Sequence, residues 1–592
     1  MQITAQIRHL TTKAIQELYQ VSIDEHAVLV NETKPEFEGD YTVVLFAFVK
    51  QLKQSPEALG DTLGKQMVAN SPNLFKSYNV IKGFLNLVVD DAYWLQVIKD
   101  QYANPAYGRK AANGQKVMVE YSSPNTNKPL HLGHLRNNFL GWSIASILEL
   151  NGYEVIKTCI VNDRGVHICK SMIAWQLFGN GATPTSIGVK GDHFVGDYYV
   201  KFNDAYKAEV NELMAKGMDK DTAEREAPIM KATQQMLVNW EAGKPEVMEL
   251  WQTMNGWVYD GFNATYARIG SSFDKTYYES NTYLLGKDLV EKGLSKNVFY
   301  QKEDGSVWID LTADGLDEKL VRRKDGTSVY ITQDIGLAEQ KTAEFGCDQS
   351  IYVVGDEQNY HFKVLKLICQ KLGLPSADGI YHLSYGMVEL PTGKMKSREG
   401  TVVDADDLVD EMVNIARQKT EELGKVKDFT DAELTELYDT IGLGALKFFL
   451  LRVDPKKKMI FNPEESIDFH GFTGPFIQYT HARIRSILRK ADAADFASTI
   501  SADLLPLEKA LAVALEQFPV VLETAANTHD PSQLAIYVFN IAKTFNSFYT
   551  EHSIANAENA EKKALRLQLS QLTATVLKTG MQALGIAVPE RM

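Results

Sequence analysis

The sequence lacks long apolar runs and has few cysteines, and each shortage excludes a class of protein. No stretch approaches the roughly 18 consecutive apolar residues that a membrane-spanning helix needs, so we expect no membrane partner. The first twenty residues show no basic segment followed by an apolar one, so we expect no secretory signal. The four cysteines lie far apart without a CxxC pair, so we expect neither a metal site nor a disulfide framework. This use of cysteine suits the reducing cytoplasm.

The chain also lacks an excess of positive charge. Its 592 residues carry a formal net charge of -14, so it is not expected to bind polyanions indiscriminately, although local basic surfaces can still do so. A chain of this length is too long for one core and predicts several domains. The sequence shows neither an internal repeat nor a low-complexity tract.

The composition divides the chain into three parts. We predict an N-terminal α+β module over 1–108, a catalytic-type α/β domain over 109–430, and a C-terminal α-helical bundle over 431–592. The α/β domain is expected to contain a polar, helical insertion over about 180–265.

The middle part carries the pattern of a βαβ unit. Residues 117–121 read as a buried strand, 134–150 as a helix, and 154–161 as the next strand. Strand character returns at 350–355 and again at 381–390. This order predicts a Rossmann-like, doubly wound parallel sheet.

The N-terminal module and the C-terminal bundle show fewer clear patterns. Helices are predicted near 10–18 and 42–52, and one strand over 79–89. From about 430 the pattern becomes all helical, with a well-capped helix starting at Asp530.

The segment HLGH follows the first strand of the βαβ unit. His131 and His134 are three residues apart, so both side chains face the start of the predicted helix, where free N–H groups and the helix dipole attract anions. Gly133 leaves room for a flat ring, and Lys128 adds a positive charge. These residues predict a polyphosphate site in which imidazoles stabilise charge on a reacting phosphate. The alternative is a pair of histidines that only cap the helix.

A second basic segment, GKMKSREGTVV, begins at Gly393 and follows a late strand. Lys394, Lys396 and Arg398 could close over phosphates as a reaction proceeds. Alone, such a segment is more often a solvated basic turn. The pairing of HLGH with this loop, after the first and last strands, is what favours catalysis.

At these residues the chain resembles the class I aminoacyl-tRNA synthetases, and among them the arginyl-tRNA synthetases. The resemblance rests on the following segments: GDY and GFLN near the N-terminus, SSPNTNKPLHLGHLR, VNDRGVHICKSM, RRKDGTSVYITQDIGLA, VVGDEQNYHF, GKMKSREGTVV, GPFIQYTHARIRSILRK, and the terminal PERM. Ser397 stands where the class usually has a second loop lysine, and Lys396 and Glu399 also depart from the family pattern.

The resemblance implies a reaction, its substrates and a set of residues. It implies ATP-dependent activation of L-arginine to arginyl-adenylate and transfer to tRNA(Arg), with ATP as a substrate that carries Mg²⁺, by a cytoplasmic monomer without a tightly bound metal. The implied catalytic residues are His131, His134, Lys128, Lys394 and Lys396. The implied ATP contacts are His131, Gly133, His134, Met387, Val388 and Lys394. The implied arginine contacts are Asn125, Glu279, Tyr330, Asp334 and Gln358, with Asp163 as a further polar contact. The implied tRNA contacts are Tyr479, Arg483 and Met592, with Phe84 and Asn86 as candidates in the N-terminal module.

Other functions stay open on the residues alone. A nucleotidyltransferase without RNA would use the same HxGH motif, but such chains usually lack a helical anticodon-type domain. A non-catalytic RNA-binding relative would not need HxGH, Lys128 and the basic loop intact. A synthetase for another amino acid would not need the acidic set around Glu279 and Asp334. Tyr479 fits a core position as well as an RNA contact.

Overall fold

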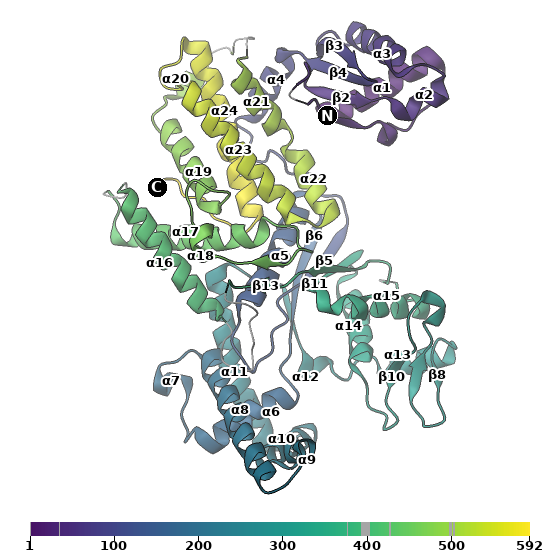
Figure 1. Ribbon diagram of the computed structural model, residues 1–592, viewed down its shortest axis with the longest axis vertical. Helices are drawn as coiled ribbons and strands as arrows, with labels where there is room; N and C mark the ends of the chain where they lie inside the picture. Colours follow the sequence, from purple (N-terminus) through teal and green to yellow (C-terminus); the bar gives the residue numbers. More distant parts are fainter. Residues whose placement is uncertain are drawn as a thin grey trace.

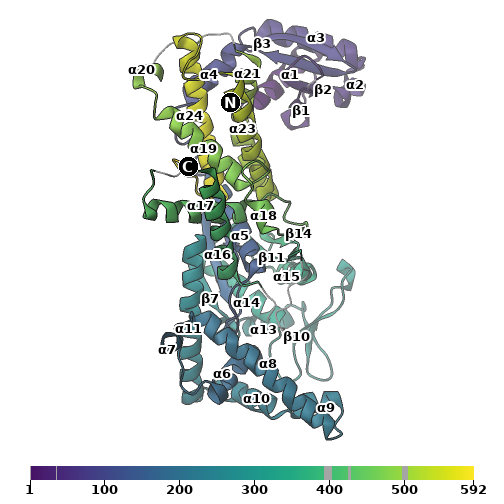
Figure 2. The same cartoon turned by 60° about the vertical axis from the view of Figure 1, so that its left-hand side comes forward.

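The protein is described by a computed structural model that covers residues 2–34, 36–375, 377–391, 403–424, 428–496, 500 and 504–592. The molecule is elongated, with the N-terminal module at one end, the parallel sheet near the middle and a group of insertion helices at the other end (Figure 1). The same order is seen after rotation (Figure 2). Among the described residues, no helix is both long and apolar enough to cross a membrane.

The N-terminal module packs helices on an antiparallel sheet of order β1-β2-β4-β3. In chain order it contains α1 (Ile3–Tyr19), η1 (Glu25–Ala27), β1 (Val30–Glu32), β2 (Tyr41–Val44), α2 (Phe46–Leu52), α3 (Pro56–Asn70), β3 (Phe75–Ile81), β4 (Phe84–Val89) and α4 (Asp91–Gln101).

Two expectations for this module are correct only in part. The helix predicted over 42–52 is present from Phe46 as α2, but its first residues belong to strand β2, because the β-branched run Thr42-Val43-Val44 fits a sheet better than a helix. The single strand predicted over 79–89 spans the end of β3, a tight turn and all of β4, which together form a hairpin. Its two-residue turn uses Lys82 at φ 50° and Gly83 at φ 78°, the left-handed pair that a tight hairpin needs.

The central sheet is parallel throughout and has the order β12-β11-β5-β6-β7. Its strands are β5 (Lys116–Glu120), β6 (Glu154–Val161), β7 (Lys275–Tyr278), β11 (Gln349–Gly355) and β12 (Ile380–Tyr385). The chain runs outward from β5 to β7 and then returns to β11 on the other side of β5. This reversal makes a topological switch point, where ligands bind outside the carboxyl ends of the strands. The predicted Rossmann-like fold class is confirmed.

Helix α5 (Leu132–Leu150) joins the sheet to the C-terminal helices. It is buried along most of its length because apolar residues occur all round it. It contacts β5, β6 and β11 and also the C-terminal helices α17 (Asp431–Leu451), α22 (Phe518–Thr528), α23 (Pro531–Glu551) and α24 (Ala560–Ala583). The start of α5, which carries the HxGH segment, is therefore fixed from two domains.

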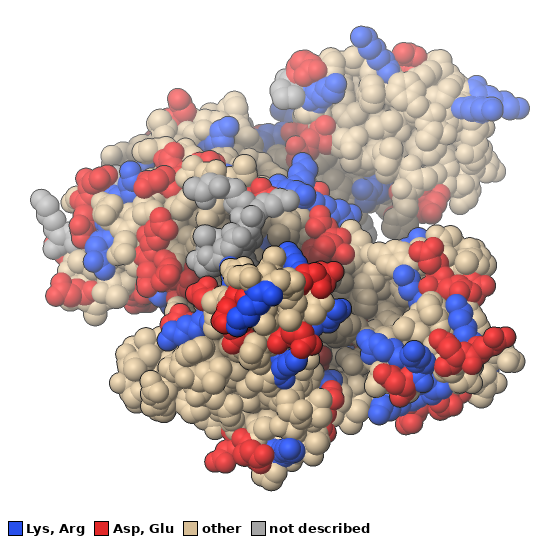
Figure 3. Space-filling model, turned by 60° about the horizontal axis from the view of Figure 1, so that its bottom comes forward, with Lys and Arg blue, Asp and Glu red and all other residues tan. Residues whose placement is uncertain are grey.

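Between β6 and β11 the chain leaves the central sheet twice. Between β6 and β7 lie α6 (Val166–Phe178), α7 (Pro184–Ile187), α8 (Gly191–Ala215), α9 (Lys220–Glu226), α10 (Pro228–Glu241) and α11 (Pro245–Ile269). Between β7 and β11 lie α12 (Glu279–Thr282), α13 (Lys287–Ser295), β8 (Tyr300–Gln301), β9 (Val307–Ile309), η2 (Thr312–Asp314), β10 (Lys319–Arg322) and α14 (Tyr330–Phe345). The antiparallel sheet β10-β9-β8 was not predicted from the sequence. Figure 3 shows positive and negative side chains interspersed over this end of the molecule.

The remaining elements complete the sheet domain and form the helical bundle. They are η3 (Asp356–Gln358), α15 (Asn359–Leu372), β13 (Val388–Glu389), α16 (Ala405–Leu423), α17 (Asp431–Leu451), β14 (Met459–Ile460), α18 (Pro463–Ser466), α19 (Gly474–Leu488), α20 (Ala493–Phe496), α21 (Pro506–Glu516), α22 (Phe518–Thr528), α23 (Pro531–Glu551) and α24 (Ala560–Ala583). The all-helical expectation after 430 is wrong at β14, which pairs with β13 in parallel. The strand predicted over 381–390 is interrupted at Gly386, where the chain leaves the central sheet.

Candidate active site

The motif residues follow strands that end at one edge of the central sheet. Asn125 and His131 come after β5, Glu279 after β7, Gln358 after β11, and Met387 after β12. Parallel strands bring their carboxyl ends to the same edge, so segments far apart in the sequence meet there. A parallel bridge between Asn125 and Asn162 ties the first two of these segments together.

His131 and His134 cap helix α5 with the same atoms of their rings. Gly133 N donates to His131 Nδ1 at 3.1 Å, and His131 N donates to His134 Nδ1 at 3.1 Å. The two ring centroids are 3.9 Å apart. A Cβ on Gly133 would lie 3.0 Å from the His131 ring, so a side chain here would press on that ring.

The capping bonds fix the protonation of both rings. Burial, helped by the charge of Lys128 and opposed by Asp404, lowers the pKa of His131 to about 4. Burial also lowers the pKa of His134 well below its ordinary value, with His131 and Lys128 adding to the effect. Both rings are therefore neutral near pH 7. Because each Nδ1 accepts a bond, each Nε2 carries the proton and is available as a donor. Capping and phosphate binding are thus compatible, since they use different nitrogens.

Three lysines were predicted to supply positive charge near this turn. Lys128 is partly buried, and burial lowers the pKa of its ammonium group. No hydrogen bond or ion pair joins it to another residue in the described part of the chain. Lys394 and Lys396 lie outside the described residues.

Four of the predicted arginine contacts line one cavity of about 800 Å³: Asn125, Glu279, Tyr330 and Asp334. Helix α14 begins at Tyr330, so Tyr330 and Asp334 lie one turn apart on the same face, as expected if a helix starts there. Glu279 opens α12 directly after β7. Gln358 does not line this cavity and is exposed in η3.

The cavity is acidic but also contains an arginine of the chain. Burial raises the pKa of Glu279; Arg164 lowers it, whereas Asp163 and Asp334 raise it further. Arg164 forms an ion pair with Glu241 at 3.1 Å, and its guanidinium carbon lies 3.9 Å from the centre of the Tyr283 ring. The region of Glu279 and Asp334 therefore holds negative charge that a positively charged ligand can neutralise.

Asp163 holds part of the protein in place. It is buried and accepts bonds from Ser280 N at 2.8 Å, Ser280 Oγ at 2.7 Å and Tyr259 Oη at 2.8 Å. These bonds fix the residue next to Glu279. Asp163 does not line the cavity of Glu279 and Asp334, and its bonds to Ser280 place the start of α12.

Sequence reasoning missed two residues of the site. His361 Nε2 lies 2.7 Å from Asp334 Oδ2. Arg136 is fully buried and donates to the carbonyl groups of Gly386, Pro455 and Lys457, so it fixes the chain where it leaves β12. Both stand inside quoted motifs, His361 three residues after Gln358 and Arg136 two after His134, and that proximity was the available signal.

The predicted adenine contacts differ in exposure. The Met387 side chain is 45% exposed, whereas Val388 is buried in β13. Of this pair, the Met387 side chain is the one open to a ligand.

The predicted RNA contacts lie on the helical bundle. Tyr479 and Arg483 are one turn apart on α19, and the Arg483 guanidinium carbon lies 4.8 Å from the centre of the Tyr479 ring. Arg483 also donates to Asn546 on α23, while Tyr479 is partly buried against the core. Met592 is likewise partly buried against the core.

The two candidate tRNA contacts in the N-terminal module, Phe84 and Asn86, differ in exposure. Asn86 is buried, accepts from Thr42 Oγ1 at 2.6 Å and donates to Asn79 Oδ1 at 2.8 Å, so its side chain serves the sheet rather than a ligand. Phe84 is 38% exposed beside Phe46.

The parallel sheet, the HxGH turn at its switch point and the following helical bundle together define a class I aminoacyl-tRNA synthetase. Family comparisons agree over most of the chain. Residues 97–462 match the catalytic domain of "tRNA synthetases class I (R)", residues 477–592 the DALR anticodon binding domain, and residues 5–89 the arginyl tRNA synthetase N terminal domain.

Full-length relatives identify the family. The arginine–tRNA ligase of Amoebophilus asiaticus is 52% identical over 597 residues and covers 100% of both chains. That of Flavobacterium psychrophilum is 52% identical with 98% of each chain covered. The solved arginyl-tRNA synthetase of Thermus thermophilus matches with a TM-score of 0.82, 25% identity and 100% coverage of both chains. The chain belongs to the arginyl-tRNA synthetase family.

Proposed function

We propose that this chain attaches L-arginine to tRNA(Arg) in two ATP-dependent steps. The observation that carries the proposal is the meeting, at one sheet edge, of two Nε2–H donors on α5 and an acidic cavity on α12 and α14. The first element suits a phosphate and the second a guanidinium.

In the first step an oxygen of the arginine carboxylate attacks the α-phosphorus of ATP. The bond from that phosphorus to the bridging oxygen breaks, and pyrophosphate leaves with the electron pair. His131 and His134 donate from Nε2 to the phosphate oxygens as charge builds there, and Lys128 adds a positive charge from the same turn. ATP brings Mg²⁺ with it, and the Met387 side chain and the backbone of Val388 flank the adenine opposite Gly133.

In the second step a hydroxyl of the terminal ribose of the tRNA attacks the arginyl carbonyl, and AMP leaves. Neither step needs a covalent enzyme intermediate, so catalysis depends on positioning and charge stabilisation. Lys394 and Lys396 supply further charge, while Asn125 and Gln358 hold the α-amino and carboxylate end of arginine.

The acidic cavity explains the choice of amino acid. Glu279 and Asp334 present carboxylates, and Tyr330 offers a ring and a hydroxyl, to a planar and permanently charged guanidinium. A neutral analogue would leave these carboxylates without a partner, which costs more than a lost methylene does. Arg164 lines the same cavity, where its own charge is paired with Glu241.

The other parts of the chain serve the tRNA. Tyr479, Arg483 and Met592 in the bundle over 431–592 contact the anticodon region, and the module over 1–108 contacts the outer corner. The enzyme acts in the cytoplasm as a monomer.

Pyrophosphate exchange with each amino acid, with and without tRNA, tests this function. Exchange that depends on arginine and on tRNA is expected. Preferential charging with another amino acid would refute the substrate. Formation of an adenylylated product without any RNA requirement would instead favour a nucleotidyltransferase.

A further inference from the structure

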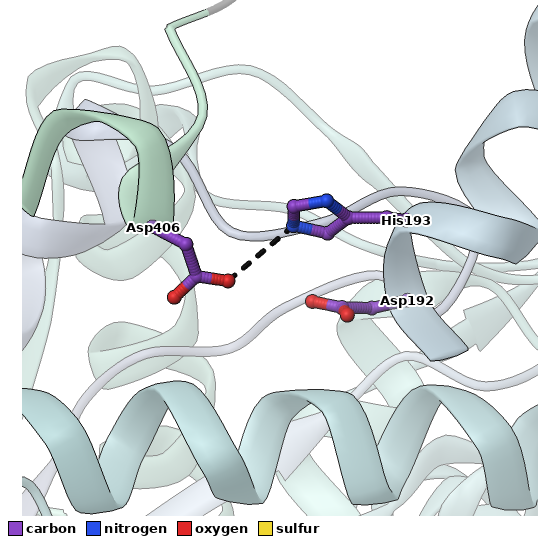
Figure 4. A group of neighbouring side chains, drawn as sticks. All are labelled: Asp192, His193 and Asp406. Carbon is purple, nitrogen blue, oxygen red and sulfur yellow. Dashed lines mark ion pairs between the residues drawn. The ribbon is translucent and has the colours of Figure 1, made fainter. Parts of the chain in front are cut away.

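A group of charged side chains lies beside the HxGH turn and is not explained by substrate binding. It joins Asp192 and His193, in the first turn of α8, to Asp406 in the first turn of α16 (Figure 4). His193 Nε2 lies 3.3 Å from Asp406 Oδ2 and 3.2 Å from Oδ2 of Asp404, the residue that caps α16. Lys190, just before α8, completes the group.

The group has the composition of a metal site, but its carboxylates are already paired with the cations of the chain. Lys190 Nζ lies 2.6 Å from Asp406 Oδ2 and 3.1 Å from Asp192 Oδ2, so an ammonium group already stands between the carboxylates. The other oxygen of Asp192 faces the backbone of α11, where a Cβ on Gly261 would lie only 2.3 Å from it. With His193 protonated, the cations Lys190 and His193 face three aspartates, 192, 404 and 406. A divalent ion would have to displace one of these two cations.

The α16 end of the group is bonded to the HxGH turn through the backbone. Leu132 N donates to Val403 O at 3.2 Å, and Ala405 N donates to Leu130 O at 3.0 Å. Asp404 and His131 form an antiparallel bridge between these two bonds. The segment that carries Asp404 therefore lies against the residue that caps α5.

The α8 end of the group also contacts this turn. A Cβ on Gly196 would lie 2.8 Å from Cδ of Pro129 and 3.6 Å from Cα of Lys128, so α8 packs closely on the segment before HxGH. His193 and Gly196 are three residues apart and share one face of α8. One helix of the insertion thus meets the HxGH turn directly through Gly196 and indirectly through His193.

We propose that His193 is a positioning residue for arginine activation: its imidazolium ties α8 to Asp404 and Asp406 and thereby fixes the backbone that holds His131. The inference rests on the proposed function, because His131 matters only if it meets a reacting phosphate. It gives the insertion a task in the chemistry, distinct from binding arginine.

The charge state of His193 suits this role. Asp404 and Asp406 raise the pKa of His193 to about 10, although burial opposes the shift, so the ring is charged at neutral pH. Although burial would raise the pKa of Asp406, His193 and Lys190 lower it. Because His193 Nε2 makes no hydrogen bond of good geometry in the described structure, its contact is an ion pair that depends on charge more than on direction. A neutral residue of similar size at position 193 should lose the ion pair with Asp404 and Asp406, and another cation there should restore it.

The test compares His193→Gln with His193→Lys in the full-length protein. Arginine-dependent pyrophosphate exchange is measured with saturating tRNA, and kcat is determined separately from the KM for arginine. We expect His193→Gln to lower kcat by about 10-fold or more, since a small misplacement of a catalytic group can cost on the order of 100-fold. The KM for arginine should stay within about twofold, because His193 does not line the arginine cavity. His193→Lys should recover most of kcat.

Two further variants separate positioning from stability. Asp404→Asn keeps a good helix cap but removes the charge; it should lower kcat, and adding His193→Gln to it should cost less than His193→Gln alone. Lys216→Gln removes an exposed ion pair with Glu212 at the far end of α8 and should leave kcat unchanged.

Several results would overturn the inference. They are an unchanged kcat with a lower melting temperature in His193→Gln, a kcat defect that Lys does not rescue, and a raised arginine KM at normal kcat. Stabilisation of the wild type, but not of His193→Gln, by Zn²⁺ or Mn²⁺ would show a metal site instead. If the wild-type protein itself shows no arginine-dependent exchange, the proposed function fails before the variants are compared.

Discussion

Replacement of Asp334 by asparagine should damage arginine binding and leave ATP binding nearly intact. Asp334 stands in the first turns of α14, lines the cavity with Glu279, and is held at one oxygen by His361 at 2.7 Å. Its second oxygen remains for a guanidinium. The change keeps the size of the side chain and one acceptor oxygen, but it removes the charge.

The size of the effect follows from the environment. A charge-assisted hydrogen bond contributes about 1.5–3 kcal/mol, and a neutral one about 1 kcal/mol. The Asp334 side chain is 38% exposed, so solvent screens it, and a deep-interior Coulomb energy does not apply. The difference is therefore about 0.5–2 kcal/mol, or roughly a 2- to 30-fold rise in the KM for arginine.

The measurement is pyrophosphate exchange at saturating ATP and tRNA with arginine varied. Asp325→Asn is the matched control, because Asp325 lines the same cavity but already accepts bonds from Thr327 N and Oγ1. That control should change the KM by less than about twofold. An unchanged KM for arginine together with a raised KM for ATP in Asp334→Asn would reverse the role assigned to this residue.

Three other changes test separate parts of the molecule. Lys128→Ala should lower kcat of adenylate formation by about 100-fold with little effect on ATP binding, and single-turnover kinetics in which only the ATP affinity fell would contradict this. Tyr479→Ala should weaken tRNA binding by about 1–3 kcal/mol through loss of a stacked base; a large drop in melting temperature with normal tRNA affinity would make Tyr479 a core residue. Burial lowers the pKa of His529 to about 4, so the unfolded chain takes up the proton first and stability should fall as pH drops from about 6.5 to 4. His529→Asn removes this titration while suiting φ 51° at that position, so urea unfolding at pH 7 and 4.5 should show a smaller loss than in the wild type.

Much of the fold could be predicted where one pattern ran through a whole element. The strand expected at 154–161 has those bounds as β6, and the helix ending at Leu150 differs by two residues at its start. The family resemblance is also confirmed by the full-length relatives. The sequence alone favoured these elements because their apolar residues recur without interruption over two or more turns or a full strand.

Short elements could not be predicted for a physical reason. Strands β8 to β10 hold two to four residues each, too few to show a period, and their stability comes from a separate core that includes Leu289, Ile309 and Ile368. The turn at Lys82 was missed because a lysine rarely adopts a positive φ. In each case the deciding contacts are distant in the sequence.

The site was predictable in its motifs but not in its partners. Asn125, Glu279, Tyr330 and Asp334 do meet in one cavity, yet which oxygen of Asp334 is free depends on His361, a residue of another helix. The roles given to the individual site residues stay predictions, which the variants test. The domain boundaries at 108 and 430 also stay predictions.

The two interpretations of HLGH, as a helix cap and as a phosphate site, are compatible with each other. A capping oxygen from serine or aspartate would satisfy the first turn of α5 but offer no donor on its far side. An imidazole does both, because accepting at Nδ1 forces the neutral ring to carry its proton at Nε2. Burial keeps each ring neutral, which prevents protonation of Nδ1 from breaking the cap. The capping bonds therefore select the tautomer that leaves both Nε2–H groups as donors, so the cap at the start of α5 also prepares the proposed phosphate site.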